Sequence, residues 1–148
     1  MDQLFSIENP LMRAYTFYNS ILCLKMLAMS VLTASQRMKN KAFANPEDAI
    51  MQKTKPKVDE NVERVRRAHL NDLENICVYF VASFGYLLTN PSVAVATMLF
   101  RVFTICRIAH TLVYAVVVIP QPARAIAWGV PYFITIYMAI KTAMHFAL

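Results

Sequence analysis

Residues 93–119 read VAVATMLFRVFTICRIAHTLVYAVVVI, an apolar run interrupted by only a few polar side chains, Arg101, Arg107 and His110 among them. A helix needs about 20 mainly apolar residues to cross a bilayer, and this run is longer than that. It also lacks the strict alternation of apolar and polar residues that marks a half-buried β-strand. The run therefore predicts a membrane-spanning helix.

Three other segments have the same character, although residues 62–89 are purely apolar only over Ile76–Leu88. Of the 148 residues, 57% are hydrophobic, whereas soluble domains contain roughly 45–50% apolar residues. A chain this short cannot bury so much apolar surface in its own core, so lipid has to cover the rest. The sequence predicts an all-α protein, an integral membrane four-helix bundle, with one domain over residues 1–148. We place its spanning helices at residues 11–36, 62–89, 93–119 and 123–147.

The positive charge of the chain is concentrated in one segment. The sequence contains 15 Lys and Arg against 9 Asp and Glu, a net charge of +6. Most of the basic residues lie between Arg37 and Arg67, and the others are spread through apolar sequence. Cytoplasmic loops of membrane proteins carry such an excess of Lys and Arg, so we expect the loop 37–61 in the cytosol and both termini in the lumen. This distribution favours a membrane protein over a nucleic-acid-binding protein.

The connections between the spanning helices carry local structure signals. The run from Asn45 to Asp48 reads NPED, in which an asparagine cap, a proline at the first helical position and two acids mark a helix start. It predicts a short surface helix over Pro46–Gln52. We expect turns at residues 89–92, on the lumenal side, and at residues 120–122, on the cytosolic side.

The cysteines and histidines give no sign of a disulfide framework or a metal centre. The three cysteines all fall inside apolar runs and form no CxxC pair, so we expect buried, unpaired thiols. The three histidines share no metal-ligand spacing, so we expect no metal. These residues are Cys23, Cys77 and Cys106, and His69, His110 and His145.

Several polar side chains lie within the predicted spanning helices, at spacings that place them on the same helix face. Ionisable groups in a membrane are costly and usually face a bundle interior or a cavity. Arg37 ends the first helix and Arg124 begins the fourth, so under the topology above these polar groups meet at the cytosolic ends of the helices. On the second predicted helix, Arg67, Asn71 and Glu74 lie on one face. On the third, Arg107, His110 and Tyr114 lie on one face.

Two interpretations of this polar level are open. An ion-pair network would hold the helices together, for example Glu74 with Arg107 or Asp72 with Arg66. Basic groups outnumber acidic ones at this level, however, and surplus positive charge near a membrane boundary calls for an anion, either lipid phosphate or a small anionic cofactor. Glu74 among the arginines indicates that the ligand also carries an amine. A ligand with two carboxylates and one ammonium would match both signs.

Several segments resemble one known family. Lys41–Asp48 (KAFANPED) and Val62–Ile76 (VERVRRAHLNDLENI) closely resemble the signature segments of the MAPEG membrane proteins, and Arg107–Tyr114 and residues 120–124 add to the match. The resemblance extends from about Lys25 to the fourth helix and is greatest to the type-one microsomal transferase branch. It implies a homotrimer of four-helix subunits that holds glutathione, as co-substrate, between neighbouring subunits near the cytosolic face.

The resemblance also implies roles for individual residues. Arg124 matches the arginine placed at the glutathione thiol, where its charge would favour the nucleophilic thiolate, and Tyr114 would donate a hydrogen bond there. Leu70 and Ala125 stand where the prostaglandin-synthase branch has an arginine and a serine, which argues against prostaglandin synthesis as the main activity. The positions that match the glutathione site are Arg37, Arg67, Asn71, Glu74, His110, Tyr114 and Arg124.

The residues and the family resemblance together predict a membrane-bound enzyme, a glutathione transferase with a role in detoxification. It would conjugate glutathione to lipophilic electrophiles from the phospholipid bilayer and also reduce lipid hydroperoxides, without a metal and without nucleic acid as a partner. A glutathione-dependent prostaglandin endoperoxide isomerase and a non-catalytic lipid-presenting scaffold are the alternatives. We expect a multi-pass protein of the endoplasmic reticulum membrane, with the mitochondrial outer membrane as a second possible location.

Overall fold

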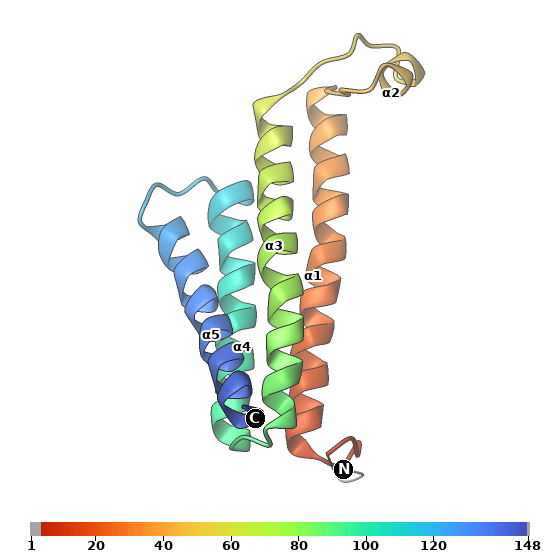
Figure 1. Cartoon of the computed structure of the whole chain (residues 1–148). Coiled ribbons are helices and arrows are strands. Elements are labelled where there is room, and N and C mark those ends of the chain that lie inside the picture. Colours follow the sequence, from red (N-terminus) through yellow and green to blue (C-terminus); the bar gives the residue numbers. More distant parts are fainter. Residues whose placement is uncertain (1–3, 148) are drawn as a thin grey trace.

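The computed structural model describes residues 4–147, and these form helices, turns and loops without a β-strand. Four long helices run side by side, and a short helix lies in the connection beyond the ends of the first two (Figure 1). The predicted all-α fold is confirmed. The helices are α1 (Pro10–Asn40), α2 (Pro46–Met51), α3 (Glu60–Leu88), α4 (Val93–Thr111), the π-helical turn η1 (Leu112–Val116) and α5 (Ala123–His145).

Three of the long helical stretches have the length and hydropathy of membrane spans. They are Pro10–Asn40, Val93–Val116 and Ala123–His145. The remaining predicted span, residues 62–89, corresponds closely to the helix α3. Its hydropathy is too low for α3 to count as a candidate membrane span. Its first half is rich in charged residues, and only its second half is apolar. The crossing of the membrane by α3 therefore stays a prediction.

Local signals set where α1 begins and ends. Asn9 caps its start, because the Asn9 side-chain oxygen accepts hydrogen bonds from the N–H groups of Leu11 and Met12, and Pro10 occupies the first helical position. The helix runs past the predicted end at residue 36 and stops at Lys41, which has a left-handed conformation with φ 47°. The Lys41 N–H group satisfies carbonyl groups of the last turn, as in other left-handed helix ends.

The helical stretch formed by α4 and η1 ends at Val116, before the predicted residue 119. The turn η1 widens the helix, and the Val117 N–H group donates to the Leu112 carbonyl at 2.8 Å. Val117 then takes an extended conformation. Pro120 follows closely, and a residue before proline is disfavoured in the helical region, so the chain leaves the helix here. The connection to α5 begins at this point.

The helix α2 forms where the sequence predicts it, but its cap differs. Asn45 occupies the N-cap position without a side-chain bond to the helix backbone. The Asn45 side-chain nitrogen instead donates to Asp48 Oδ2 at 3.2 Å. The two acids of the first turn still lie at the positive end of the helix dipole.

The helix α3 has neighbours on two sides. It packs against α1 on one side and against α5 on another, and α4 packs against both α1 and α5. Among residues 4–147, α1 and α5 make no contact with each other. This arrangement gives α3 two separate polar faces, one beside α1 and one beside α5.

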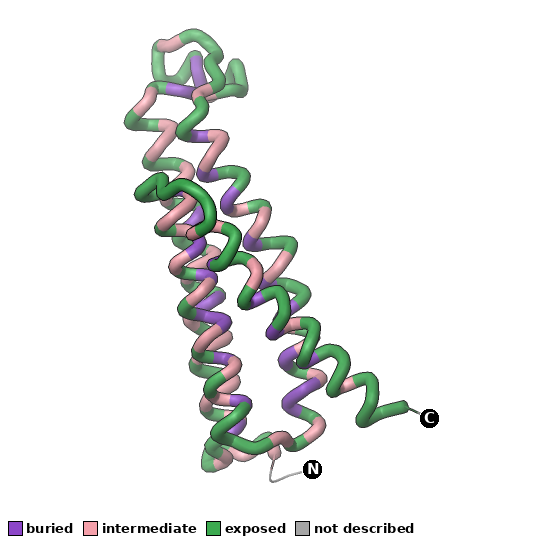
Figure 2. The backbone as a smooth tube through the Cα atoms, turned by 90° about the vertical axis from the view of Figure 1, so that its left-hand side faces the viewer, coloured by how far each residue is buried: buried purple, intermediate pink, exposed green. Residues whose placement is uncertain are grey.

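The buried side chains form two apolar clusters along the bundle. One cluster includes a stacked pair, Tyr79 and Phe103, with ring centres 3.5 Å apart. The other is smaller and includes Met29 and Ala68. Exposed residues predominate along the outer faces of the helices (Figure 2), and many of them are large and apolar. Such a surface fits lipid or further protein better than water.

The thiols are not buried as predicted. Cys23 and Cys77 are exposed on the surface of the single chain, and Cys106 is half-buried. All three are free, without a disulfide. Cys23 and Cys77 lie on faces of α1 and α3 that turn away from the apolar core, which the hydrophobicity of the surrounding sequence does not reveal.

Candidate functional site

A pocket of about 420 Å³ lies between α3, the α4–η1 stretch and the start of α5. Six of the seven predicted site residues line it. The helix register explains the α3 group, because residues at i, i+4 and i+7 share one face. The six residues are Arg67, Asn71 and Glu74 from α3, His110 from α4, Tyr114 from η1 and Arg124 from α5.

The π-helical turn contributes one wall of the pocket. Tyr114 lies in η1, where the helix is wider than an α-helix, a feature that is frequent at functional sites. The Tyr114 ring meets the buried His110 ring edge to face, with centroids 5.5 Å apart. On its other side the guanidinium carbon of Arg124 lies 4.7 Å from the ring centroid, a cation–π contact. Arg124 and Tyr114, the two proposed catalytic residues, are therefore in direct contact.

The pocket presents charges of both signs. Arg67 forms an exposed ion pair with Glu60, with Nη2 and Oε1 2.5 Å apart. Among residues 4–147, neither Glu74 nor Arg124 forms an ion pair. A free carboxylate and a free guanidinium thus share one pocket, and each is available to a ligand of opposite charge.

Arg37 lies elsewhere in the single chain. It lines a second pocket of about 360 Å³ between α1 and α3, together with Thr33, Arg66 and His69. This pocket lies on the face of α3 that packs against α1, whereas the first pocket lies on the face beside α5. Leu70 lines both. Within one chain the structure does not bring Arg37 to the other six residues.

The pocket also contains residues that the sequence reasoning did not select as site residues. Gln121 and Trp128 line it, and so do the apolar side chains of Leu70 and Ala125. The Gln121 side-chain oxygen accepts a hydrogen bond from the Ala125 N–H group at 3.1 Å, which fixes the first turn of α5. A signal for Trp128 was present, because it follows Arg124 by four residues and so shares its helix face.

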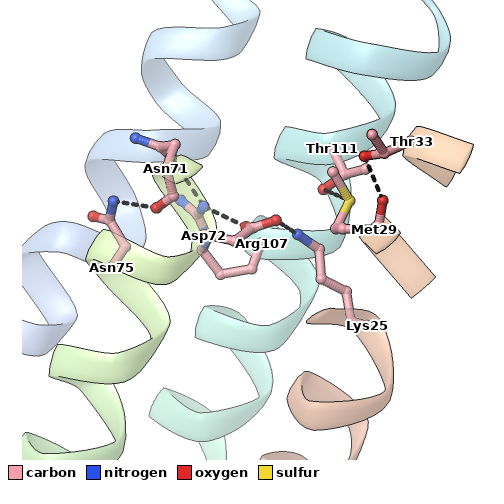
Figure 3. Close-up of polar contacts among 8 residues, drawn as sticks. All are labelled: Lys25, Met29, Thr33, Asn71, Asp72, Asn75, Arg107 and Thr111. Carbon is pink, nitrogen blue, oxygen red and sulfur yellow. Dashed lines mark hydrogen bonds and ion pairs between the residues drawn. The ribbon is translucent and has the colours of Figure 1, made fainter. Parts of the chain in front are cut away.

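Ion pairs do join the helices, but their partners differ from the two pairs given as examples of such a network. Arg107 pairs with Asp72 (Figure 3), with Nη2 and Oδ1 2.6 Å apart. The pair with Glu74 does not form. The other oxygen of Asp72 accepts from Lys25. Arg66 pairs with Glu63 on its own helix at 2.7 Å. Asp72 faces the bundle interior, while the neighbouring Glu74 is exposed and faces the pocket.

Two other basic residues have partners within the chain. The Arg101 Nε donates to the Tyr18 hydroxyl oxygen at 2.8 Å, and the Lys141 ammonium lies 5.9 Å from the Tyr137 ring centroid. Neither belongs to the pocket. In the part of the chain from residue 4 to residue 147, no group of three His, Cys, Asp or Glu side chains is arranged to hold a metal ion.

The pattern that defines the MAPEG family matches residues 15–144. The chain belongs to the MAPEG family. It is 44% identical to mouse "Microsomal glutathione S-transferase 1" over 141 residues, 91% of this chain and 90% of the relative. The human protein of the same name is 40% identical over equal shares. Human "Prostaglandin E synthase" is 37% identical over 110 residues, 73% of this chain and 72% of that protein.

The family resemblance read from the sequence is thereby confirmed. Membership of MAPEG and three helices of spanning length and hydropathy identify a multi-pass membrane protein. The signature segments Lys41–Asp48 and Val62–Ile76 lie within the matched residues, and the second supplies Arg67, Asn71 and Glu74 of the pocket. The MAPEG match therefore includes the α3 face on which the candidate site is built.

Proposed function

We propose that this protein is a membrane-bound glutathione transferase that conjugates glutathione to lipophilic electrophiles. One observation carries the proposal: an unpaired Glu74 lies in the same pocket as Arg67 and Arg124. Glutathione has two carboxylates and one ammonium group. The ammonium pairs with Glu74 and a carboxylate pairs with Arg67, while Arg124 is left for the sulfur.

The chemistry follows from the position of Arg124. A guanidinium beside the glutathione sulfur stabilises the thiolate, which is the nucleophile. The thiol proton passes to water, the thiolate forms a carbon–sulfur bond with the electrophile, and the leaving group departs with its electron pair. With a lipid hydroperoxide the same site oxidises two glutathione molecules to their disulfide and yields an alcohol and water. Tyr114, held against Arg124, donates a hydrogen bond to the sulfur.

We further propose that four helices cross the membrane and that three copies of the chain assemble around the site. Arg37 lies on the α1 side of α3, and the exposed apolar faces of the helices are available to a further copy. In the proposed homotrimer, Arg37 of one subunit completes the glutathione site of its neighbour. The proposed location is the endoplasmic reticulum membrane, with the mitochondrial outer membrane as the alternative.

A glutathione-dependent prostaglandin endoperoxide isomerase is the second candidate function. The 37% identity to human "Prostaglandin E synthase" favours it. Leu70 and Ala125 oppose it, because both line the pocket and neither supplies the arginine or the hydroxyl group that the synthase branch has at these positions. The non-catalytic scaffold is disfavoured by the full set of charged residues in the pocket.

Two activity assays on the purified protein in lipid separate these functions. The first measures conjugation of glutathione to a chlorinated nitrobenzene, and the second measures isomerisation of a prostaglandin endoperoxide. We expect conjugation to exceed isomerisation clearly. Isomerisation without conjugation would favour the second candidate, and glutathione binding without either activity would favour the scaffold.

A further inference from the structure

A buried group of three charges lies at the junction of α1, α3 and α4. Asp72 and Arg107 have no exposed surface, and Lys25 is largely buried. Two cations share one carboxylate, so the group carries a net positive charge. Along α1, α3 and the α4–η1 stretch, the group lies between the buried residues of the two apolar clusters. Buried ion pairs are a poor source of stability compared with apolar packing, so this group calls for another role.

One nitrogen of Arg107 joins this group to the pocket. Arg107 Nη2 donates to Asp72 Oδ1 at 2.6 Å and also to Asn71 Oδ1 at 3.0 Å. Asn71 lines the pocket, but Asp72 and Arg107 do not. Figure 3 shows the Asn71 side chain at the end of this chain of contacts, with its amide nitrogen directed away from Arg107. The contact with Arg107 thus lies immediately behind the pocket wall.

The contact fixes which atom Asn71 can offer to a ligand. A guanidinium only donates hydrogen bonds, so the atom of Asn71 that faces Arg107 must be its oxygen. The amide nitrogen, which only donates, is then left for the pocket. Without Arg107 the amide would be free to turn over and to present its oxygen instead.

We infer that Arg107, held by Asp72 and Lys25, is a positioning residue that sets Asn71 as a hydrogen-bond donor in the pocket. The ligand group at Asn71 is then an acceptor, a carboxylate or a peptide carbonyl, while the ligand ammonium is at Glu74, one turn further along α3. The two side chains together would recognise an acceptor and an ammonium group of the same ligand. This inference rests on the proposed binding of glutathione in this pocket.

A double-mutant cycle tests the coupling between Arg107 and Asn71. Lysine at position 107 keeps the positive charge beside Asp72 but is shorter and lacks the planar fork, so it loses the contact with Asn71. We expect Arg107→Lys and Asn71→Ala each to raise the glutathione dissociation constant about tenfold, the effect of one hydrogen bond to a charged group. The double variant should bind no more weakly than Asn71→Ala alone. A purely structural role for Arg107 would instead give additive losses, and additivity would overturn the inference.

A second variant tests the orientation of Asn71 while Lys25, Asp72 and Arg107 all stay in place. Asn71→Asp keeps an oxygen for Arg107 but removes the donor that faces the pocket. We expect weaker glutathione binding by about tenfold or more. If Asn71 presented its oxygen to the ligand ammonium, the same variant would bind glutathione as well as the wild type or better, and the inference would be wrong.

A matched control lies on the same helix. Arg101→Lys changes an arginine of α4 whose contact is with Tyr18, outside the pocket, and should leave the dissociation constant unchanged. Thermal unfolding and oligomer size of each variant show whether it is folded. If the wild-type protein itself bound no glutathione, the proposed function would fail together with this inference. If the wild type bound glutathione but the losses of the two single variants were additive, this inference would fail and the proposed function would stand.

Discussion

Replacement of Arg124 by leucine should damage the chemical step more than glutathione binding. Arg124 lies in the first turn of α5, with its guanidinium 4.7 Å from the Tyr114 ring centroid. The residue at the helix start, Pro122, provides no side-chain cap, and Gln121 accepts from the Ala125 N–H group alone. The other N–H groups of the first turn therefore add positive potential at the same place. Both charges act most strongly on a sulfur that has become anionic, which places their effect on the thiolate.

The size of the effect follows from the electrostatics of the pocket. Unit charges about 4 Å apart interact by about 4 kcal/mol at an effective dielectric constant of about 20. The pocket is open to water, so the lower range for a hydrogen bond to a charged group, about 1.5–3 kcal/mol, is more appropriate. Since one pKa unit corresponds to about 1.4 kcal/mol, the thiol–thiolate equilibrium shifts about tenfold to a hundredfold toward thiolate.

Thiolate absorbance, turnover and glutathione binding, measured on the same variant, separate the effect on chemistry from the effect on binding. The ultraviolet absorbance of bound thiolate at neutral pH should disappear in Arg124→Leu, and most turnover should be lost, while the glutathione dissociation constant rises much less. Arg124→Lys retains the charge and should keep a larger part of the thiolate signal. If Arg124→Leu kept both the signal and the turnover, Arg124 would be only an anchor at the membrane boundary, and Tyr114 would become the leading candidate.

Three further predictions concern binding, topology and packing. Glu74→Gln should raise the glutathione dissociation constant about tenfold to a hundredfold through loss of a charged hydrogen bond, with oligomer size unchanged in chromatography; an unchanged constant would return Glu74 to a structural role. A protease added to sealed microsomes should cleave near Lys55 if the loop 37–61 is cytosolic, and protection until detergent is added would reverse the topology. Gly85→Ala should lower the unfolding temperature, because the new methyl group would lie 2.8 Å from Thr142 Cγ2, whereas Gly129→Ala meets nothing within 4 Å and should raise the stability by about 0.5–1 kcal/mol. Equal unfolding temperatures for the two glycine variants would contradict the described packing of α3 against α5.

The sequence predicted the helices well because their signals are local. Apolar length, the cap at Asn9 and the prolines near residue 120 lie within or next to each helix. The same local logic placed Arg67, Asn71 and Glu74 on one face of α3. The predicted end of α1 is too early because the last turn of the helix is polar, so the apolar run ends before the helix ends.

The sequence does not predict how the helices are rotated and shifted against one another. Asp72 and Glu74 are close in sequence and both acidic, yet one pairs with Arg107 in the interior and the other lines the pocket. Which of them meets Arg107 depends on the rotation and height of α3 against α4, and these are set by packing. The separation of Arg37 from the other six residues has the same origin, since it depends on which face of α3 packs against α1.

Electron cryo-microscopy of the protein in lipid nanodiscs at saturating glutathione would show directly whether this pocket binds glutathione. We expect glutathione density in the pocket between α3, η1 and α5, with the sulfur beside Arg124 and the ammonium beside Glu74. In the proposed homotrimer, Arg37 of a neighbouring subunit closes the site. An empty pocket at saturating glutathione, or glutathione bound elsewhere on the protein, would contradict the proposed glutathione site.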